Sequence, residues 1–332
     1  MNCLVIGGTG FVGQPLVAEL LKAGHSVAVM HRRAKHNLGR KVRNIMADRN
    51  DAQAVRTALA GSKFELVFDN VYDWDRGTTA GHVEATVRAA GDNIKRYVFL
   101  SSVAAYGDGL NHHEGDALAP DDAPELYVRN KAMSERALFR LHQRIGLPVV
   151  TLRPPYIYGP GNPYYREAFF WDRLRAGRPI ILPGDGRRLM QFVYIKDLVK
   201  AALRAVDEPA AAGHAFNIAN PRPISQTEAV EAFAKACRKT PKFVRIPREY
   251  VLRAGGHPMG PKLYFGVYFD IPPITLVTAK AQRVLKFKPT DFVTGLKETH
   301  RWYLRNNGFP KPDFGFEDAL LANAPVLAPA KA

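Results

Sequence analysis

Short runs of hydrophobic residues recur through the first half of the chain, separated by stretches with helical spacing. Segments with apolar residues on one helical face, such as Gln14–Leu21 and Thr78–Ala90, lie between these runs. The regular alternation predicts an α/β fold with a doubly wound parallel sheet. The expected strands are Met1–Ile6, Ser26–Met30, Arg43–Ala47, Phe64–Asp69 and Tyr97–Leu100.

The link between the first strand and the first helix carries three regularly spaced glycines. Gly7 permits a tight turn, Gly10 leaves bare backbone for a phosphate, and Gly13 lets the helix pack closely on the sheet. A helix N-terminus also attracts anions, and a strand-to-helix link is the context in which this spacing marks a dinucleotide site. The expected cofactor contacts in this loop are Gly7, Thr9, Gly10, Phe11, Val12 and Gly13.

The ends of the second and third strands bear on which dinucleotide is bound. Sites that prefer NAD usually carry Asp or Glu after the second strand, but here His31 is followed by Arg32 and Arg33. A guanidinium can form two hydrogen bonds to a 2′-phosphate, so we expect NADP, with NAD as the alternative. In an alternative interpretation, Arg32 stacks on the adenine. Asp48 is a candidate acceptor for the adenine amino group, or else the N-cap of the next helix.

A candidate catalytic group follows the fifth strand. Tyr127 and Lys131 are four residues apart in a predicted helix, so both side chains project from one face. A phenol titrates near pH 10, and a neighbouring ammonium stabilises the phenolate and lowers that pKa. We predict that Ser102, at the end of the strand, orients a substrate oxygen while Tyr127 exchanges its proton. Lys131 is also expected to hold the nicotinamide ribose.

With these residues in place, the chain resembles the extended short-chain dehydrogenase/reductases of the NAD-dependent epimerase/dehydratase family. Further matching segments bring the resemblance to nearly all of residues 1 to 305. They are Leu152–Gly161, Pro183–Gly186, Phe192–Leu198, Phe216–Ala219 and Leu285–Pro289. The family implies Ser102, Tyr127 and Lys131 as the catalytic trio, with Tyr127 as general acid/base, and Pro154 as a further cofactor contact.

The resemblance also implies a division of the chain. A dinucleotide-binding Rossmann domain is expected over residues 1–154, receiving about 192–220 as well. A smaller, interleaved substrate-binding domain is expected over 155–191 and 221–315. The Ala- and Pro-rich end, 316–332, is expected to be a disordered tail. Extended members of the family often form homodimers, so a homodimer is expected by analogy.

Departures from the family pattern narrow the reaction. Val103 and Ala104 stand where dehydratases and decarboxylases of this family carry acidic residues, and neither can move a proton. We therefore expect hydride transfer at a secondary alcohol or ketone, by an epimerase or a reductase. Tyr156 and Leu189–Gln191 replace an Asn and an Arg that contact sugar nucleotides in many epimerases. These departures weaken the assignment of a sugar-nucleotide substrate without excluding it. The expected substrate is therefore sugar-nucleotide-like or another small molecule.

The charge of the chain supports a second interpretation. A formal net charge of +16 favours polyanions, or else describes a solvated basic surface. The run Gly186–Leu198 resembles the chloroplast stem-loop-binding proteins, atypical members of the superfamily that bind RNA and have degenerate catalytic motifs. Tyr127 and Lys131 are intact here and no RRM signature is present, so RNA binding is the alternative function.

Other features exclude several classes of site. Cys3 and Cys237 are too few for a disulfide framework or a four-cysteine zinc site, and the adjacent His112 and His113 cannot easily converge on one ion. No metal is expected. No segment has transmembrane length, and no charged-then-apolar leader precedes the first strand, so we expect a cytoplasmic protein without membrane contact.

Overall fold

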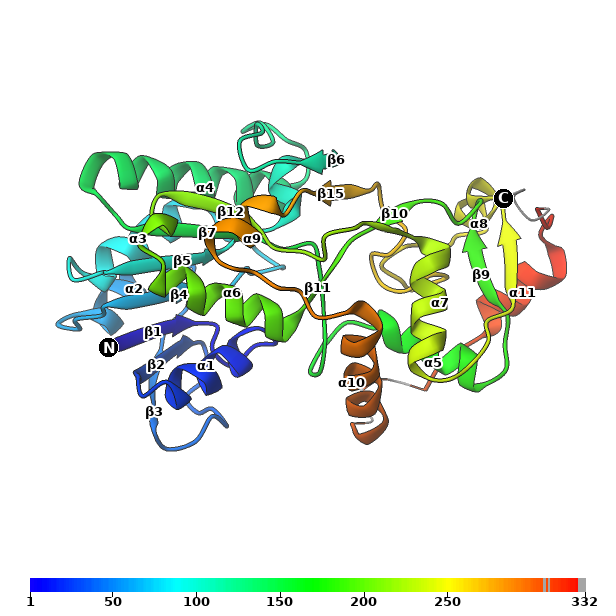
Figure 1. Ribbon diagram of the computed structural model, residues 1–332, viewed down its shortest axis with the longest axis horizontal. Coiled ribbons are helices and arrows are strands. Elements are labelled where there is room, and N and C mark those ends of the chain that lie inside the picture. Colours follow the sequence, from blue (N-terminus) through cyan, green and yellow to red (C-terminus); the bar gives the residue numbers. More distant parts are fainter. Residues whose placement is uncertain (307–308, 310, 328–332) are drawn as a thin grey trace. The chain divides into compact units, whose positions relative to one another are not determined.

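A seven-stranded parallel sheet forms the centre of the first of two compact units in the computed structural model, which describes residues 1–306, 309 and 311–327. This unit comprises Met1–Pro155, Ile195–Pro221 and Leu276–Lys288. The sheet order is β12-β7-β5-β4-β1-β2-β3, so the predicted doubly wound α/β fold is confirmed (Figure 1). The strands are β1 (Asn2–Ile6), β2 (Ser26–His31), β3 (Val42–Met46), β4 (Leu66–Asp69), β5 (Arg96–Leu100), β7 (Val149–Arg153) and β12 (His214–Asn217).

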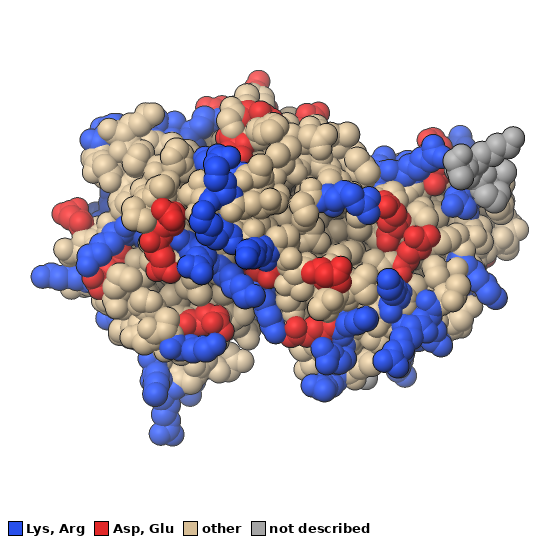
Figure 2. All heavy atoms as spheres, viewed as in Figure 1, with Lys and Arg blue, Asp and Glu red and all other residues tan. Residues whose placement is uncertain are grey.

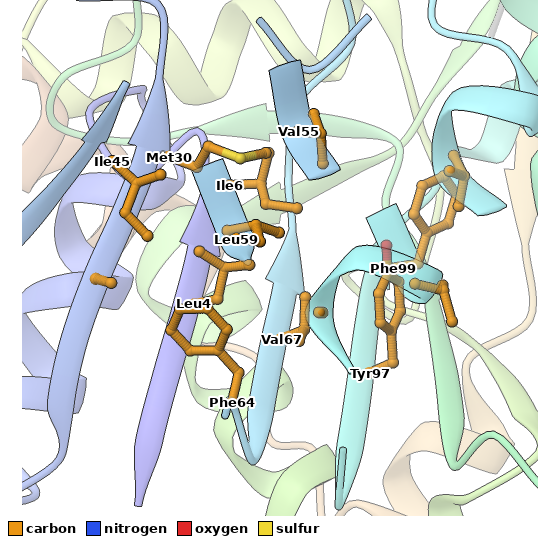
Figure 3. Close-up of a cluster of buried hydrophobic side chains, with 14 of the residues drawn as sticks. Leu4, Ile6, Met30, Ile45, Val55, Leu59, Phe64, Val67, Tyr97 and Phe99 are labelled. Atoms are coloured by element: carbon orange, nitrogen blue, oxygen red, sulfur yellow. The ribbon is translucent and has the colours of Figure 1, made fainter. Parts of the chain in front are cut away.

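Helices cover both faces of the sheet. On one face, alternate strand residues such as Leu4, Met30 and Tyr97 meet Val55 and Leu59 from a helix, and they form the buried cluster of Figure 3. α1 and α6 pack together, α1 against β1 and β2, and α6 against β5. The helices of this unit are α1 (Gly13–Lys22), α2 (Ala52–Leu59), α3 (Ala80–Ala90), α4 (Leu126–Ile145), α6 (Ile195–Asp207) and α9 (Ala279–Val284), with the short 3₁₀ helices η1 (Val103–Tyr106) and η2 (Pro209–Ala211).

The register of the sheet brings the carboxyl ends of the central strands to one edge. Ile6 of β1 pairs with Met30 of β2 and with Asp69 of β4, while Leu100 of β5 pairs with Leu152 of β7. At this edge the chain leaves the sheet in the glycine-rich turn, in the loop after β4 and in the turn that contains Ser102. In open α/β sheets ligands bind outside this edge, so the fold gathers the candidate residues there.

The second unit contains short strand pairs and helices. Its core contains Tyr158, Phe169, Phe170 and Trp171, all fully buried, as expected for the packing of this aromatic-rich segment. Its elements are β8 (Tyr156–Tyr158), α5 (Glu167–Arg175), β9 (Ile180–Pro183), β10 (Leu189–Met190), β11 (Phe192–Tyr194), β13 (Ile224–Ser225), α7 (Gln226–Ala236), β14 (Phe243–Ile246), α8 (Arg248–Arg253), α10 (Phe292–Arg305) and α11 (Gly315–Asn323). Two more short strands are β6 (Gly109–His112), of the first unit, and β15 (Ile274–Leu276).

Two expectations about the division of the chain need correction. Leu276–Lys288 lies in the first unit although 221–315 was assigned to the substrate domain, because Asn217 Nδ2 donates to the Val277 carbonyl at 3.2 Å and Leu276 packs with Tyr106. The tail expected to be disordered contains α11. The buried side chain of Leu320 and a buried ion pair between Glu317 and Arg173 hold this helix in place. Residues 328–332 of that tail lie outside the described residues.

Within the described ranges, we find no helix that combines the length and the apolar character needed to cross a membrane.

Candidate functional site

The glycine-rich loop connects β1 to α1 through a closely packed turn. Gly7 has a positive φ of 77°, and its carbonyl accepts the Gly10 amide at 3.0 Å. A Cβ on Gly13 would lie 2.1 Å from the Gly7 carbonyl oxygen, so this position requires glycine for the helix to begin against its own loop. Gly10 is exposed, and a Cβ there would meet only the Gly7 oxygen, at 3.3 Å. The loop therefore presents bare backbone at Gly10, directly before the helix.

The N-terminus of α1 has no competing anion of its own. The N-cap residue, Val12, offers no side-chain cap, and the first turn holds no acidic residue. Thr9 and Phe11 are half-buried, and the Thr9 carbonyl accepts the Gln14 side-chain amide at 2.9 Å. The positive end of the helix dipole is thus available to an external anion, as the glycine spacing predicts.

Charged side chains gather beyond the ends of β2 and β3. The exposed Arg32 lies 3.5 Å from an Asp73 carboxylate oxygen, and Arg76 donates to Asp73 at 2.6 Å and to Asp48 at 2.7 Å. Asp48 also accepts the Asn50 amide at 2.9 Å. The N-cap of α2 is Asp51, so the alternative role of Asp48 as a helix cap is wrong. Because Arg76 and the turn amides hold Asp73, Arg32 is the least constrained cation of this group.

The three predicted catalytic residues come from two neighbouring elements. Ser102 follows β5, is nearly buried, and its Oγ accepts the Ala104 amide at 3.1 Å. Tyr127 and Lys131 lie in the first two turns of α4, with Lys131 Nζ 5.8 Å from the centre of the Tyr127 ring. Lys131 Nζ donates to the Leu100 carbonyl at 2.7 Å, two residues before Ser102. This hydrogen bond ties the helix to the end of the strand.

The end of β7 closes the same turn from the other side. The Pro154 carbonyl accepts the Val103 amide at 3.0 Å, directly after Ser102. Pro154, expected to contact a cofactor, thus holds the backbone of the Ser102 turn.

Two aromatic residues that the sequence did not point to hold the Tyr127 ring. Trp74 stacks on it with ring centres 4.6 Å apart, and Tyr72 meets it edge-on at 4.7 Å. Both belong to the loop between β4 and α3, and the Tyr72 hydroxyl accepts a hydrogen bond from Asn130 at 3.2 Å. Trp74 is 55% exposed. These two ring contacts hold the phenol of Tyr127 in place.

The ammonium of Lys131 is buried. Its pKa falls from 10.5 to about 8, chiefly because burial disfavours the charged form; the charge of Asp69 opposes this and that of Arg49 adds to it. Near neutral pH the amine is still mostly protonated, so a positive charge faces the Tyr127 region from a site with little water to screen it.

This shift predicts an unusual stability profile for Lys131→Met. The unfolded amine titrates near 10.5, so between about pH 8 and 10.5 the unfolded chain holds a proton that the folded chain has lost, and the stability of the parent rises with pH. Below pH 8 the buried charge lowers the stability of the parent by about 3 kcal/mol, whereas the hydrogen bond to the Leu100 carbonyl raises it by about 1 kcal/mol. We expect the variant to be more stable than the parent by about 2 kcal/mol at pH 7, and the difference to fall by about 3 kcal/mol towards pH 10.5.

Urea unfolding across this pH range, followed by circular dichroism, measures the difference. Lys200→Met, whose side chain is 73% exposed, is the control and should show no such trend. A difference between Lys131→Met and the parent that stays constant with pH would contradict the lowered pKa.

A buried carboxylate network lies next to the candidate catalytic residues. Glu135, one turn beyond Lys131 on α4 and fully buried, accepts hydrogen bonds from Thr151 at 2.9 Å, from Ser101, and from Arg153 Nη2 at 2.7 Å. Arg153 in turn donates to the Tyr106 hydroxyl at 2.7 Å. The network connects α4, β7 and the strand end that carries Ser102. The role of this network is structural, since hydrogen-bond donors already occupy both carboxylate oxygens of Glu135.

A second buried group joins Arg49, which follows β3, to Asp69 at the end of β4 and Tyr97 near the start of β5. Asp69 accepts the Tyr97 hydroxyl at 2.7 Å and pairs with Arg49, and Arg49 also donates to the His82 carbonyl at 2.8 Å. Burial, with the charge of Asp69, raises the pKa of Tyr97 well above its usual range, so this phenol stays protonated. Asp69 supports the protonated state of Lys131 with its negative charge, and Glu135 does so as well.

The histidine pair of the loop after η1 is used in local contacts. His112 stacks on Tyr106 with ring centres 4.3 Å apart, and its Nδ1 lies 3.0 Å from Asp116. Glu114 accepts the Asn217 amide at 2.9 Å. Over residues 1–306, 309 and 311–327, no group of three His, Cys, Asp or Glu side chains is arranged to hold a metal ion.

Sequence reasoning missed Glu135, Arg153, Asp69, Tyr72 and Trp74. A signal existed for the first: Glu135 stands four residues after Lys131 and eight after Tyr127, so a carboxylate falls on the face that must be buried. Arg153 ends an otherwise apolar strand, and such a position calls for a buried partner. Tyr72 and Trp74 lie in a loop without periodicity, and only the folded chain brings them to Tyr127.

The chain is similar to several known proteins. Among curated proteins, "Chloroplast stem-loop binding protein of 41 kDa b, chloroplastic" of Arabidopsis thaliana is 31% identical, and the match spans 98% of this chain and 85% of that protein. UDP-glucuronate 4-epimerase 1 of Arabidopsis thaliana is 25% identical over 93% of this chain and 78% of its own length.

Among solved structures, the UDP-glucuronic acid 4-epimerase from Bacillus cereus in complex with UDP-glucuronic acid and NAD is similar, with a TM-score of 0.71 at 18% identity, covering 92% of this chain and 99% of that one. Residues 3–219, which include the glycine-rich loop, Ser102, Tyr127 and Lys131, match the NAD dependent epimerase/dehydratase family. The chain therefore belongs to the NAD dependent epimerase/dehydratase family of short-chain dehydrogenases/reductases.

Proposed function

We propose that the protein is an NAD(P)-dependent enzyme that transfers a hydride at a secondary alcohol or ketone, as an epimerase or a reductase. The observation that carries the proposal is the group formed by Tyr127, Lys131 and the end of β5. Lys131 Nζ reaches the Leu100 carbonyl at 2.7 Å beside Ser102, and the same ammonium lies 5.8 Å from the Tyr127 ring. A buried cation beside a phenol is the arrangement that makes the phenol a usable acid/base near neutral pH.

The residues of the first unit fit a dinucleotide. Bare backbone at Gly10 and the uncapped N-terminus of α1 suit a pyrophosphate, since a Cβ at Gly10 would meet only its own loop and no acidic residue stands in the first turn. The adenosine end would lie towards Arg32 and Asp48, and Lys131 would hold the nicotinamide ribose. When bound, the nicotinamide supplies the carbon that accepts or returns the hydride.

The chain's own side chains carry the proton. Ser102 Oγ already accepts the Ala104 amide, so its hydroxyl hydrogen is free to donate to the substrate oxygen. The Tyr127 phenolate takes the proton from the carbinol as it is oxidised, and the phenol so formed returns that proton when the ketone is reduced. Lys131 stabilises the phenolate that is present before the carbinol is oxidised, and the rings of Trp74 and Tyr72 keep the phenol in place.

For the substrate we propose a small carbonyl or carbinol compound, sugar-nucleotide-like or of another class. Curated relatives include UDP-glucuronate 4-epimerase 1 and the 2-alkyl-3-oxoalkanoate reductase of Stenotrophomonas maltophilia, which is 31% identical over 71% of this chain and 76% of that protein. The two names support an epimerase and a reductase respectively. Val103 and Ala104 lack titratable groups, and this argues against dehydration or decarboxylation.

We expect NADPH to bind more tightly than NADH. A 2′-phosphate would take hydrogen bonds from Arg32, which is 65% exposed and holds only a 3.5 Å contact to Asp73. Arg32→Ala should weaken NADPH about tenfold and leave NADH within about twofold, because charge-assisted hydrogen bonds contribute about 1.5–3 kcal/mol. Titration of nicotinamide fluorescence, on protein freed of nucleotide and with the released nucleotide identified by mass spectrometry, measures both constants.

Arg33→Ala is the matched control, since Arg33 is the neighbouring exposed cation. Tighter binding of NADH in the parent would reverse the cofactor preference and assign a ribose-binding role to Asp73. A parent protein that binds neither nucleotide would contradict the proposed function itself.

A second candidate function is RNA binding. It is favoured by the match over 98% of this chain to a protein named for stem-loop binding, together with the formal net charge of +16. Nothing in the group around Tyr127 requires RNA, so the redox function stands first. An RNA hairpin is one of the probes of the experiment described next, and that experiment tests this candidate too.

A further inference from the structure

We infer that the second unit carries a phosphate-binding groove between α7 and α10, separate from the dinucleotide site and independent of the proposed redox function. The two helices pack side by side, and Figure 2 shows Lys and Arg side chains gathered over this part of the unit. The groove is open to solvent and has a volume of about 540 Å³. It is lined by Lys235, Ala236, Cys237, Arg238, Lys297, His300 and Arg301.

The cations of the groove come from two places in the sequence. Lys235 and Arg238 lie at and just beyond the end of α7, while Lys297 and Arg301 are one turn apart on α10. All four side chains belong to exposed residues, and within the described part of the chain no ion pair engages any of them. Four like charges around one hollow repel each other, and this cost is relieved when an anion enters.

Neighbouring groups do little to neutralise these charges. Asp291, the N-cap of α10, lies close enough to Lys235 and Lys297 for their charges to lower its pKa, but backbone and side-chain hydrogen bonds from Thr294 are the first causes of that shift. Its carboxylate is already held by Thr294, at 2.9 Å from both the amide and Oγ1. Arg175 on α5 adds a further positive charge near Cys237 and His300.

His300 is a hydrogen-bonding group without a partner in this groove. Its Nε2 is buried, and among the residues that the structure describes nothing bonds to it. The ring packs against Trp171 with centres 5.0 Å apart. Burial, with the charge of Arg175, lowers the His300 pKa, so the ring is neutral at pH 7 and can donate one hydrogen bond.

The lining residues also narrow the chemistry of the ligand. Among the described residues that line the groove, His300 carries the only aromatic ring, so they offer no stacking surface for a series of bases. Aliphatic stems and four cationic heads recognise phosphate groups rather than the bases attached to them. Those phosphates can come from a free oligophosphate or from a nucleic-acid backbone.

The test compares Lys297→Gln/Arg301→Gln with the parent and with Arg56→Gln/Arg140→Gln, two exposed helical arginines of the first unit. The two double variants lose the same charge and alter only exposed side chains. Inorganic tripolyphosphate, by calorimetry, and a fluorescently labelled RNA hairpin, by anisotropy, are the two probes. The groove variant should lose about tenfold or more in affinity for at least one probe, and its salt dependence should fall by about 1.5 to 2 in log–log slope.

The outcomes separate the sources of phosphate. A loss for tripolyphosphate alone identifies a small oligophosphate as the ligand, and a loss for the hairpin identifies a nucleic-acid backbone. Equal losses in the groove and control variants, or no loss in either, would overturn the inference. NADPH binding by both variants should match the parent, so failure of this groove and failure of the redox function are distinguishable.

Discussion

Replacing Tyr127 with Phe is expected to lower kcat by about 10²–10⁴-fold, the range typical of lost general acid/base catalysis. The change removes only the hydroxyl oxygen, and with it the group that exchanges the proton of the carbinol. The ring remains stacked on Trp74 at 4.6 Å and edge-on to Tyr72 at 4.7 Å, so the fold and the cofactor contacts should be unchanged. The measurement is nicotinamide absorbance during turnover, with the substrate that the parent accepts from a panel of sugar nucleotides and small ketones.

Tyr72→Phe is the matched control for this experiment. It removes the neighbouring phenol, whose hydroxyl accepts a hydrogen bond from Asn130, while leaving Tyr127 and Lys131 in place. We expect Tyr72→Phe to keep kcat within about threefold, since it does not touch the reacting atoms. Both variants should bind NADPH within about twofold of the parent. A Tyr127→Phe protein that retained more than about a tenth of the parent kcat would contradict the proposed mechanism.

Local sequence was sufficient for those parts of the fold that depend on periodicity. The strands up to β5 and the helix with Tyr127 lie within a few residues of their predicted positions, because a buried parallel strand must be apolar and a helix over a sheet must be amphipathic. The glycine spacing likewise reflects a local constraint. Gly13 faces the Gly7 carbonyl of its own loop, so the requirement can be read from thirteen consecutive residues.

The remaining features depend on contacts between distant residues. Arg76 holds both Asp48 and Asp73, so the carboxylate after β3 is engaged in a way that its position in the sequence does not reveal. α11 was missed because its stability comes from Glu317 binding Arg173, 144 residues away, and not from its own composition. Trp74 was missed for the same reason, because it meets Tyr127 only in the folded chain.

The network around Glu135 is the contact set whose loss should destabilise the first unit most. Glu135→Leu is expected to lower the free energy of unfolding by about 3–5 kcal/mol, because it leaves the Arg153 guanidinium buried without its counter-charge. Arg153 is 3% exposed, and its guanidinium donates three hydrogen bonds of 2.7–3.1 Å to Glu135. Chemical denaturation followed by circular dichroism measures the change.

Two comparisons separate this effect from a general sensitivity to substitution. Glu84→Leu removes one partner of the exposed pair with Arg88 and should cost less than about 1 kcal/mol. The double variant Glu135→Leu/Arg153→Leu removes both buried charges and should recover much of the loss, since no uncompensated ion remains. A double variant no more stable than Glu135→Leu would mean that the hydrogen bonds to Ser101 and Thr151, and not the buried charge of Arg153, account for the contribution of Glu135.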